Sequence, residues 1–210
     1  MTEGAADSES GWRRRGRTEK YCGIWGIQQL DSASHAVPTV VEAGVSVRPA
    51  GAVRVRALIE LLLGLKGQGL TQHEVFAFAD AYELWDAFTV DENELVLEPA
   101  PQPQELVQAA WRYERANVFG WALGNVRHLH FADNAVDGAA LLESALPGLA
   151  SPVTELRSHK DLLDSADIHL LLAAICRGAR TSGVAPPANL DPGVVHEREV
   201  AFDWLLGRVQ

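Results

Sequence analysis

The chain has 210 residues, of which 47% are hydrophobic and 22% are charged, a composition typical of one ordinary globular domain. Eighteen basic residues against 28 acidic ones give a formal net charge of −10. Because an acidic surface repels phosphate backbones, we expect no nucleic-acid partner. No apolar run approaches the roughly 20 residues that a membrane span needs, so no membrane association is expected.

The cysteines and histidines predict neither a disulfide nor a metal site. Cys22 and Cys176 lie far apart and match no metal or redox spacing. Since no export signal is recognisable, a reducing cytoplasm is the expected compartment. His128 and His130 could share a metal on a strand, but no His-Glu-x-x-His or paired-cysteine motif accompanies them. We therefore expect no metal and no cofactor.

The N-terminal half is predicted to run from a tail into helices. Residues 1–17, "MTEGAADSESGWRRRGR", are small, polar and charged, which predicts a disordered tail before a single helical domain over 18–210. From Ala52 the apolar residues recur at helical spacing, and they stop at the Gly-Gln-Gly of 67–69.

An acidic stretch follows this first long helix. Thr71 and Glu74 have the spacing of a capping box, which predicts a helix that buries Val75, Phe78, Tyr82 and Trp85. Between Lys66 and Arg112 the chain has nine acidic residues and no lysine or arginine. This composition predicts an acidic helical surface, which is either simply solvated or attracts a basic partner.

The C-terminal half is predicted to hold the core. One helix is expected from Pro103 to about Val126, a short one from Asp137 to before Pro147, a long one from Ser158 to Gly183, and a last one from Asp191 almost to Gln210. "IHLLLAAI" (168–175) is apolar all round except for His169. The sequence thus predicts an all-α bundle of about six or seven helices with a buried central helix near 160–182.

Two segments resemble the domain of unknown function 4272 family. They are "AAWRYERANVFGWALGNVRHL" (109–129) and "SADIHLLLAAICRGARTSGVAPPANLDPGVVHEREVAFDWLLG" (165–207), and the similarity covers roughly residues 50 to 207. The matching positions are Trp111, Arg112, Glu114, Trp121, Ala122, Leu123, Gly124, Asp167, Arg177, Arg180, Asp191, Val195, Glu197, Arg198, Ala201, Trp204 and Leu205. The resemblance implies a helical, soluble, bacterial-type domain and supplies no activity.

The chain departs from this family inside the predicted central helix. Where the family often has an Arg-x-His-Trp run, this chain has Leu171, Leu172, Ala173 and Ala174. If that run carries an activity in the family, this member has lost or changed it.

The matched segments bring charged residues to three helices: Arg112 and Glu114, then Arg177 and Arg180, then Glu197 and Arg198. Buried charge must be paired, so one interpretation is a structural clamp of arginine–carboxylate bonds. The other is a polar pocket whose arginines bind a carboxylate or phosphate ligand.

The periodicity of the last helix allows particular partners to be named. It places Arg198 inward, and the best predicted partner is Glu114. Glu197 is predicted to meet Arg112, Arg177 or Arg180, while Glu199 should be exposed.

No catalytic residue is predicted. Asp161, Ser165 and His169 share a helix face, but no nucleophile elbow accompanies them, and a core histidine is the expected outcome. Our main hypothesis is therefore a non-catalytic protein-interaction or regulatory module with an acidic helical surface, which binds a protein partner, possibly a basic one, or itself. The alternatives are an enzyme or small-molecule binder at the arginine–glutamate cluster, and a structural subunit of a larger assembly.

Overall fold

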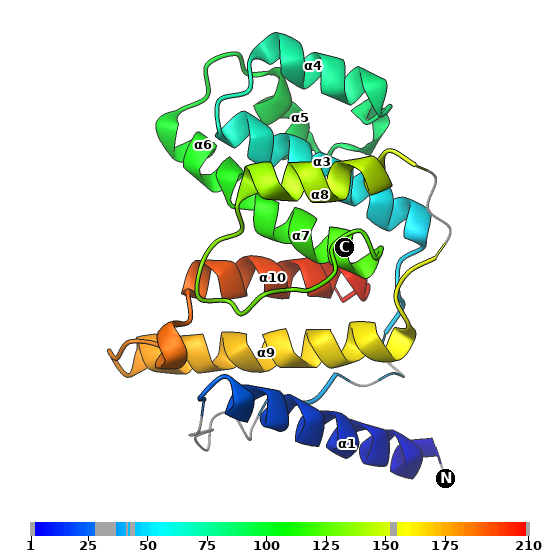
Figure 1. Ribbon diagram of the computed structural model, residues 1–210, viewed down its shortest axis with the longest axis vertical. Coiled ribbons are helices and arrows are strands. Elements are labelled where there is room, and N and C mark those ends of the chain that lie inside the picture. The colour runs from blue at the N-terminus through cyan, green and yellow to red at the C-terminus, as the bar shows by residue number, and fades with distance from the viewer. Residues whose placement is uncertain (1–2, 28–36, 41, 43–44, 152–154, 209–210) are drawn as a thin grey trace. The chain divides into compact units, whose positions relative to one another are not determined.

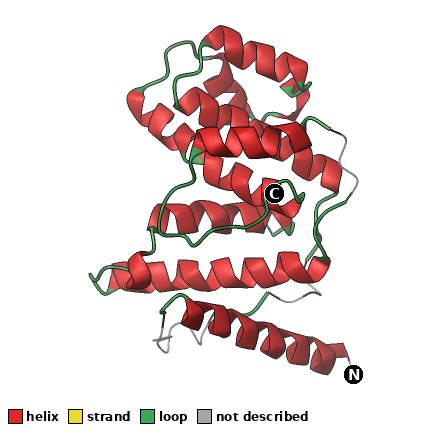
Figure 2. Cartoon of the chain, in the orientation of Figure 1, coloured by secondary structure: helices red, strands yellow, loops and turns green. Residues whose placement is uncertain are grey.

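The computed structural model describes residues 3–27, 37–40, 42, 45–151 and 155–208. Across these residues the chain forms helices and loops and no strand, which confirms the all-α class (Figure 2). None of the described helices is both long enough and apolar enough to cross a membrane.

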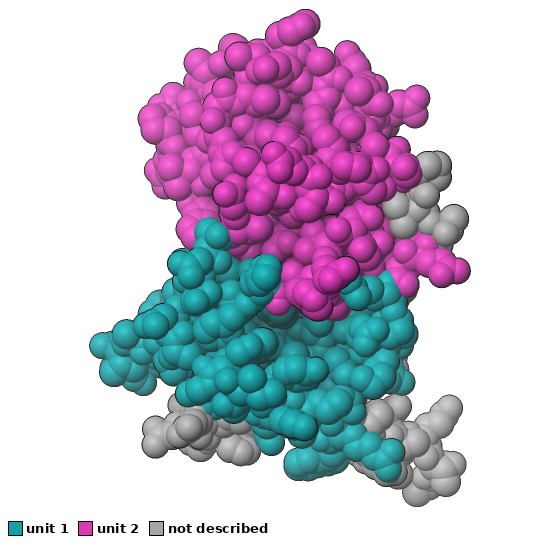
Figure 3. Space-filling view, in the orientation of Figure 1, with its two compact units in different colours: residues 1–48, 130–135, 157–210 teal, residues 49–129, 136–156 magenta. Residues whose placement is uncertain are grey.

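The described residues group into two compact units (Figure 3). Unit 1 consists of residues 1–48, 130–135 and 157–210, and unit 2 of residues 49–129 and 136–156. The backbone passes between them four times, so neither unit is a continuous segment. That residues 18–210 fold as a single domain stays a prediction.

Unit 1 is a stack of three helices, with α9 in the middle (Figure 1). They are α1 (Glu3–Ile24), α9 (His159–Thr181) and α10 (Pro192–Leu205), and a short 3-10 turn, η3 (Pro187–Asn189), precedes α10. Residues of α9 are buried along most of its length, which confirms the predicted central helix. The predicted cap of α10 is present, because the Asp191 carboxylate accepts the N–H groups of Gly193 and Val194 at 2.7 and 3.3 Å.

Unit 2 is built around α3 (Ala50–Gly67), whose apolar side chains are buried on almost every face. The helices α4 (Gln72–Ala81), α5 (Val90–Leu97), α6 (Pro103–Ala110), α7 (Arg112–Ala122) and α8 (Gly138–Leu149) all contact it (Figure 1). The close approach of α6 requires a glycine at the end of α3, because a Cβ atom at Gly67 would clash with the backbone of Leu106 and Ala110.

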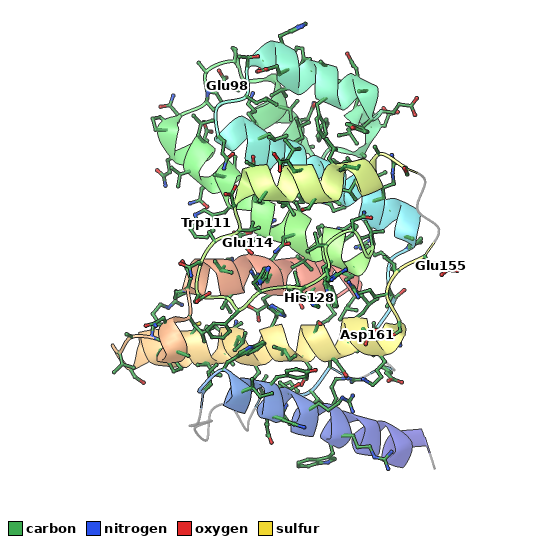
Figure 4. The ribbon with its side chains drawn as sticks, in the orientation of Figure 1. Glu98, Trp111, Glu114, His128, Glu155 and Asp161 are labelled. Atoms are coloured by element: carbon green, nitrogen blue, oxygen red, sulfur yellow. The ribbon has the colours of Figure 1, made fainter. Side chains whose placement is uncertain are left out.

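The structure has more helices than the six or seven predicted, for two reasons. The predicted 103–126 helix is divided into α6 and α7 at Trp111, which is labelled in Figure 4. The acidic stretch contains a second capping box, in which Thr89 and Glu92 begin α5.

The prediction of a disordered tail over residues 1–17 was wrong, because α1 begins at Glu3. Its buried side is a stripe with the spacing of one helix face, formed by Gly11, Arg14, Arg15, Thr18 and Cys22. Most of this stripe is polar, so hydropathy periodicity could not identify it as the packing face of a helix.

Two carboxylates of α9 hold this stripe. The Asp167 carboxylate, which is fully buried, accepts from Thr18 Oγ1 at 2.7 Å, the Val40 N–H at 3.0 Å and Arg15 Nη2 at 3.4 Å. The Asp164 carboxylate accepts from Arg14 Nε at 3.3 Å, and also from both Nε and Nη2 of Arg17, beside the stripe, at 2.9 and 2.6 Å. α1 is therefore attached to α9 chiefly by charge-assisted hydrogen bonds.

The protonation of Asp164 follows from these contacts. Burial opposes ionisation, but hydrogen bonds from Arg17 and Lys160 outweigh it and hold the pKa of Asp164 below its ordinary value. The stabilisation it provides is present above the pKa of an unfolded aspartate and is lost as the pH falls through the lower native pKa.

Removing both carboxylates should release α1. In an Asp164→Asn, Asp167→Asn double variant, buried arginines lose their counter-charges, which costs about 3–5 kcal/mol and raises the detached fraction more than about a hundredfold. Trypsin should then cleave after Arg13 to Arg17 much faster than in the wild-type protein, as followed by mass spectrometry. Asp133→Asn, at an exposed position in the same unit, is the control. Cleavage at the wild-type rate would show that these carboxylates do not hold α1.

Candidate functional site

A pocket of about 570 Å³ lies in unit 1, where α9 and α10 run side by side (Figure 1). Its lining consists of Ala173, Cys176, Arg177 and Arg180 from α9, Val184 and Pro186 from the connecting loop, and Pro192, Val195, His196 and Glu199 from α10. Most of the lining side chains are apolar, and the charged ones are few. This size and this lining are typical of sites for small organic molecules.

The residues that line the pocket have the same sequence spacing on both helices. The α9 residues stand at positions 173, 176, 177 and 180, and the α10 residues at 192, 195, 196 and 199. Each set has the pattern i, i+3, i+4, i+7, which is one face of a helix. Ala173, which belongs to the 171–174 stretch where the resemblance to the family breaks down, has the smallest side chain of the lining.

An ion pair crosses the pocket from one helix to the other. Arg177 Nη1 donates to both carboxylate oxygens of Glu199, at 3.0 and 2.8 Å. The Glu199 side chain is only 14% exposed, so the prediction that it would be exposed was wrong. The Arg177 side chain is 53% exposed, so the pair lies at the rim.

Arg180 lies one turn further along α9 on the same wall. It is exposed, and among the described residues its guanidinium group makes no hydrogen bond or ion pair. Apart from His196, the pocket thus holds two positive charges and one negative charge, a net charge of +1 in a chain of net charge −10. Such a site favours anions.

The pocket also contains a thiol. Burial, followed by the negative charge of Asp191, raises the pKa of Cys176 to about 11. Because the thiolate is the nucleophilic form, a thiol that is protonated at neutral pH is a poor nucleophile.

Arg112 belongs to a charge cluster within unit 2. Arg56 and Arg112 face Glu60 and Glu92 there: Arg56 Nη2 lies 2.7 Å from Glu60 Oε1, Arg56 Nη1 3.0 Å from Glu92 Oε2, and Arg112 Nη1 3.2 Å from Glu60 Oε2. The carboxylates are nearly buried, and their charges balance those of the two arginines. The cluster joins α3, α5 and α7.

Glu92 titrates at lower pH because of this pairing. Burial opposes its ionisation, but the hydrogen bond and charge of Arg56 prevail, so its pKa lies below the ordinary value. The cluster therefore stabilises unit 2 above the pKa of an unfolded glutamate and loses that effect as the pH falls through the native pKa.

The remaining predicted cluster residues are all buried. Glu114, labelled in Figure 4, accepts the N–H of Val136 at 2.5 Å within unit 2. Arg198 donates from Nη1 to the carbonyl oxygen of His130 at 2.6 Å within unit 1, and this holds the 130–135 segment to α10. The pairing of Arg198 with Glu114 stays a prediction, as does the partner of Glu197.

His169 has a structural environment. It is buried, its Nδ1 lies 2.8 Å from the carbonyl oxygen of Ser165, and its ring is tilted by 31° against that of Phe202, with centroids 4.9 Å apart. Burial, reinforced by the charge of Arg198, lowers the pKa of His169 to about 3, so the ring is neutral. Within the described ranges, no group of three or more His, Cys, Asp or Glu side chains is arranged to hold a metal ion.

Fold and pocket together define an all-α protein with a mostly apolar pocket of net charge +1 between two helices. The chain belongs to the family Domain of unknown function (DUF4272), whose model matches residues 17–210. This match begins within α1, well before the residue 50 suggested by the sequence segments alone. Comparison with curated proteins and with solved structures finds no match to the chain.

The charge cluster of unit 2 should be essential for stability. Replacing Glu60 by alanine leaves Arg56 and Arg112 with one carboxylate between them, and breaking such a buried network costs about 3–5 kcal/mol. Urea denaturation should show this loss in the free energy of unfolding. The control, Glu94→Ala at an exposed position of α5, should stay within about 0.5 kcal/mol of the wild type. Equal losses of unfolding free energy in the two variants would mean that Glu60 contributes no more to stability than an exposed glutamate does.

Proposed function

We propose that this protein is a non-catalytic binding module whose α9–α10 pocket takes a small organic anion, a carboxylate or phosphate group on an apolar body. The observation that carries the proposal is Arg180, an arginine without a partner among the described residues, in the wall of an otherwise mostly apolar pocket. A guanidinium group binds either anion through two parallel hydrogen bonds.

The rest of the lining supports the apolar part of this ligand. Ala173, Val184, Pro186, Pro192 and Val195 offer hydrocarbon surface and no hydrogen-bonding side chain. An ion without an apolar body would leave this surface in contact with water, so binding energy favours a ligand that covers it.

The chemistry of the lining supports binding over catalysis. The Cys176 thiol, with its pKa raised to about 11, is a weak nucleophile, and the charge of Glu199 is already engaged by Arg177. The protein-interaction and assembly roles predicted from the sequence remain separate hypotheses, and neither uses this pocket. The free thiols of Cys22 and Cys176 support a reducing compartment such as the cytoplasm.

Octanoate and octyl phosphate, compared with octanol, test the proposal by isothermal titration calorimetry. Both anions should bind to the wild-type protein, and octanol should bind at least about tenfold more weakly, since a charge-assisted hydrogen bond contributes about 1.5–3 kcal/mol. In the Arg180→Gln variant the affinity for each of the two anions should fall by about tenfold, while the affinity for octanol stays the same.

The matched control is Lys20→Gln, which removes one positive charge at an exposed position of α1. It should leave the affinity for all three compounds unchanged. The proposal is overturned if the anions do not bind, if they bind no better than octanol, or if Arg180→Gln and Lys20→Gln have the same effect.

Glu199→Gln should strengthen anion binding. The change frees Arg177 and raises the net charge of the pocket from +1 to +2, so the affinity for octanoate should rise several-fold. Because the lost ion pair lies at the rim, the variant should be destabilised by no more than about 1 kcal/mol. Unchanged or weaker binding of octanoate by a folded Glu199→Gln protein would contradict the assignment of Arg177 and Arg180 as anion ligands.

A further inference from the structure

A second surface, whose chemical character differs from that of the pocket, lies on unit 2. Five of the fifteen aromatic residues of the chain fall between positions 76 and 88: Phe76, Phe78, Tyr82, Trp85 and Phe88. The prediction that the helix here would bury Phe78, Tyr82 and Trp85 was wrong, since all five side chains are only half-buried. The buried side of α4 is instead formed by the smaller Val75 and Ala79.

Trp85 is held in a fixed orientation among these rings. Phe76 and Phe88 form T-shaped pairs with it, with ring centroids 5.5 and 5.8 Å away and interplanar angles of 69° and 75°. Asp80 Oδ1 accepts its indole N–H at 2.6 Å. We call Phe76, Trp85 and Phe88 the aromatic patch.

Exposed carboxylates accompany the aromatic patch. Asp80, Glu83, Asp86 and Asp91 are all exposed within twelve residues of chain, and no lysine or arginine lies between positions 67 and 111. Glu83 adopts a φ of 55°, in the left-handed region where glycine is favoured, at the end of α4. A strained backbone that keeps an acidic side chain at this position agrees with a functional role for the carboxylate.

The neighbouring helix adds exposed hydrocarbon. Val90 and Leu97, at the two ends of α5, are 74% and 51% exposed. Half-buried aromatic rings, exposed aliphatic side chains and unneutralised carboxylates therefore belong to one short stretch of chain, and all three kinds of group gain from contact with a long basic side chain.

We propose that the aromatic patch and its carboxylates form a docking surface for a lysine- or arginine-rich segment of a partner protein. One cationic side chain lies over the Trp85 ring, and its neighbours pair with Asp86 and Asp91. Charge complementarity favours a basic segment of a partner over a second copy of this chain. A second copy of the chain would bring a net charge of −10, and its arginines 14, 15 and 17 already bind carboxylates of their own unit.

Fluorescence polarisation with a short labelled peptide of lysine and leucine tests the surface, with a matched peptide of glutamate and leucine for comparison. The basic peptide should bind and the acidic one should not. Trp85→Phe, which keeps an aromatic ring but weakens the attraction for a cation, should raise the dissociation constant about fivefold. Trp12→Phe, at a tryptophan that is 76% exposed on α1, should leave it unchanged.

The carboxylates have a matched control as well. Asp86→Asn with Asp91→Asn should weaken binding of the basic peptide about tenfold, and Glu143→Gln, at an exposed position of α8, should not. Octanoate binding should be the same in all these variants, which separates this proposal from the function of the pocket. Equal effects of Trp85→Phe and Trp12→Phe, or binding of the acidic peptide, would overturn the proposal.

Discussion

The requirement that buried charge be paired determines how both units are held together. In unit 1 the fully buried Asp167 receives three donors from α1 and the segment that follows it, and this attaches an otherwise polar helix to α9. In unit 2 Glu60 and Glu92 are enclosed by two arginines. Arg180, by contrast, is an exposed arginine that makes no hydrogen bond or ion pair among the described residues, and it lies in the wall of a pocket.

The parts of the fold that depend on apolar periodicity could be predicted from the sequence. The central helix α9 was predicted almost to the residue, and so was the start of α10, because an all-round apolar run and a capping aspartate are local signals. Helix α1 could not be predicted, since Arg14, Arg15 and Thr18 identify a packing face only when Asp164 and Asp167 are known to face them. Contacts between residues some 150 positions apart leave no local pattern in a sequence.

Only part of the candidate site could be predicted from the sequence, because the rest depends on which helices face each other. Arg177 and Arg180 could be named from the family resemblance, yet the resemblance does not tell which arginine is neutralised. Helical spacing could have found Cys176 beside Arg177, and His196 beside Glu199, but only the facing of α9 and α10 shows that the two stripes line one pocket. Arg112 pairs with Glu60 and Glu92 within unit 2, and the single cluster of all six charged residues stays a prediction.

The central claim is that Arg180 is available to an anion while Arg177 and Arg198 are already engaged. Nuclear magnetic resonance of the arginine side-chain Nε–H groups tests it directly during a titration with octanoate. We expect the Arg180 resonance to shift and to saturate, and the resonance of Arg198, which donates to the His130 carbonyl oxygen, to stay in place. An Arg180 resonance that does not move while octanoate binds elsewhere, or a shift centred on Arg198, would contradict the account.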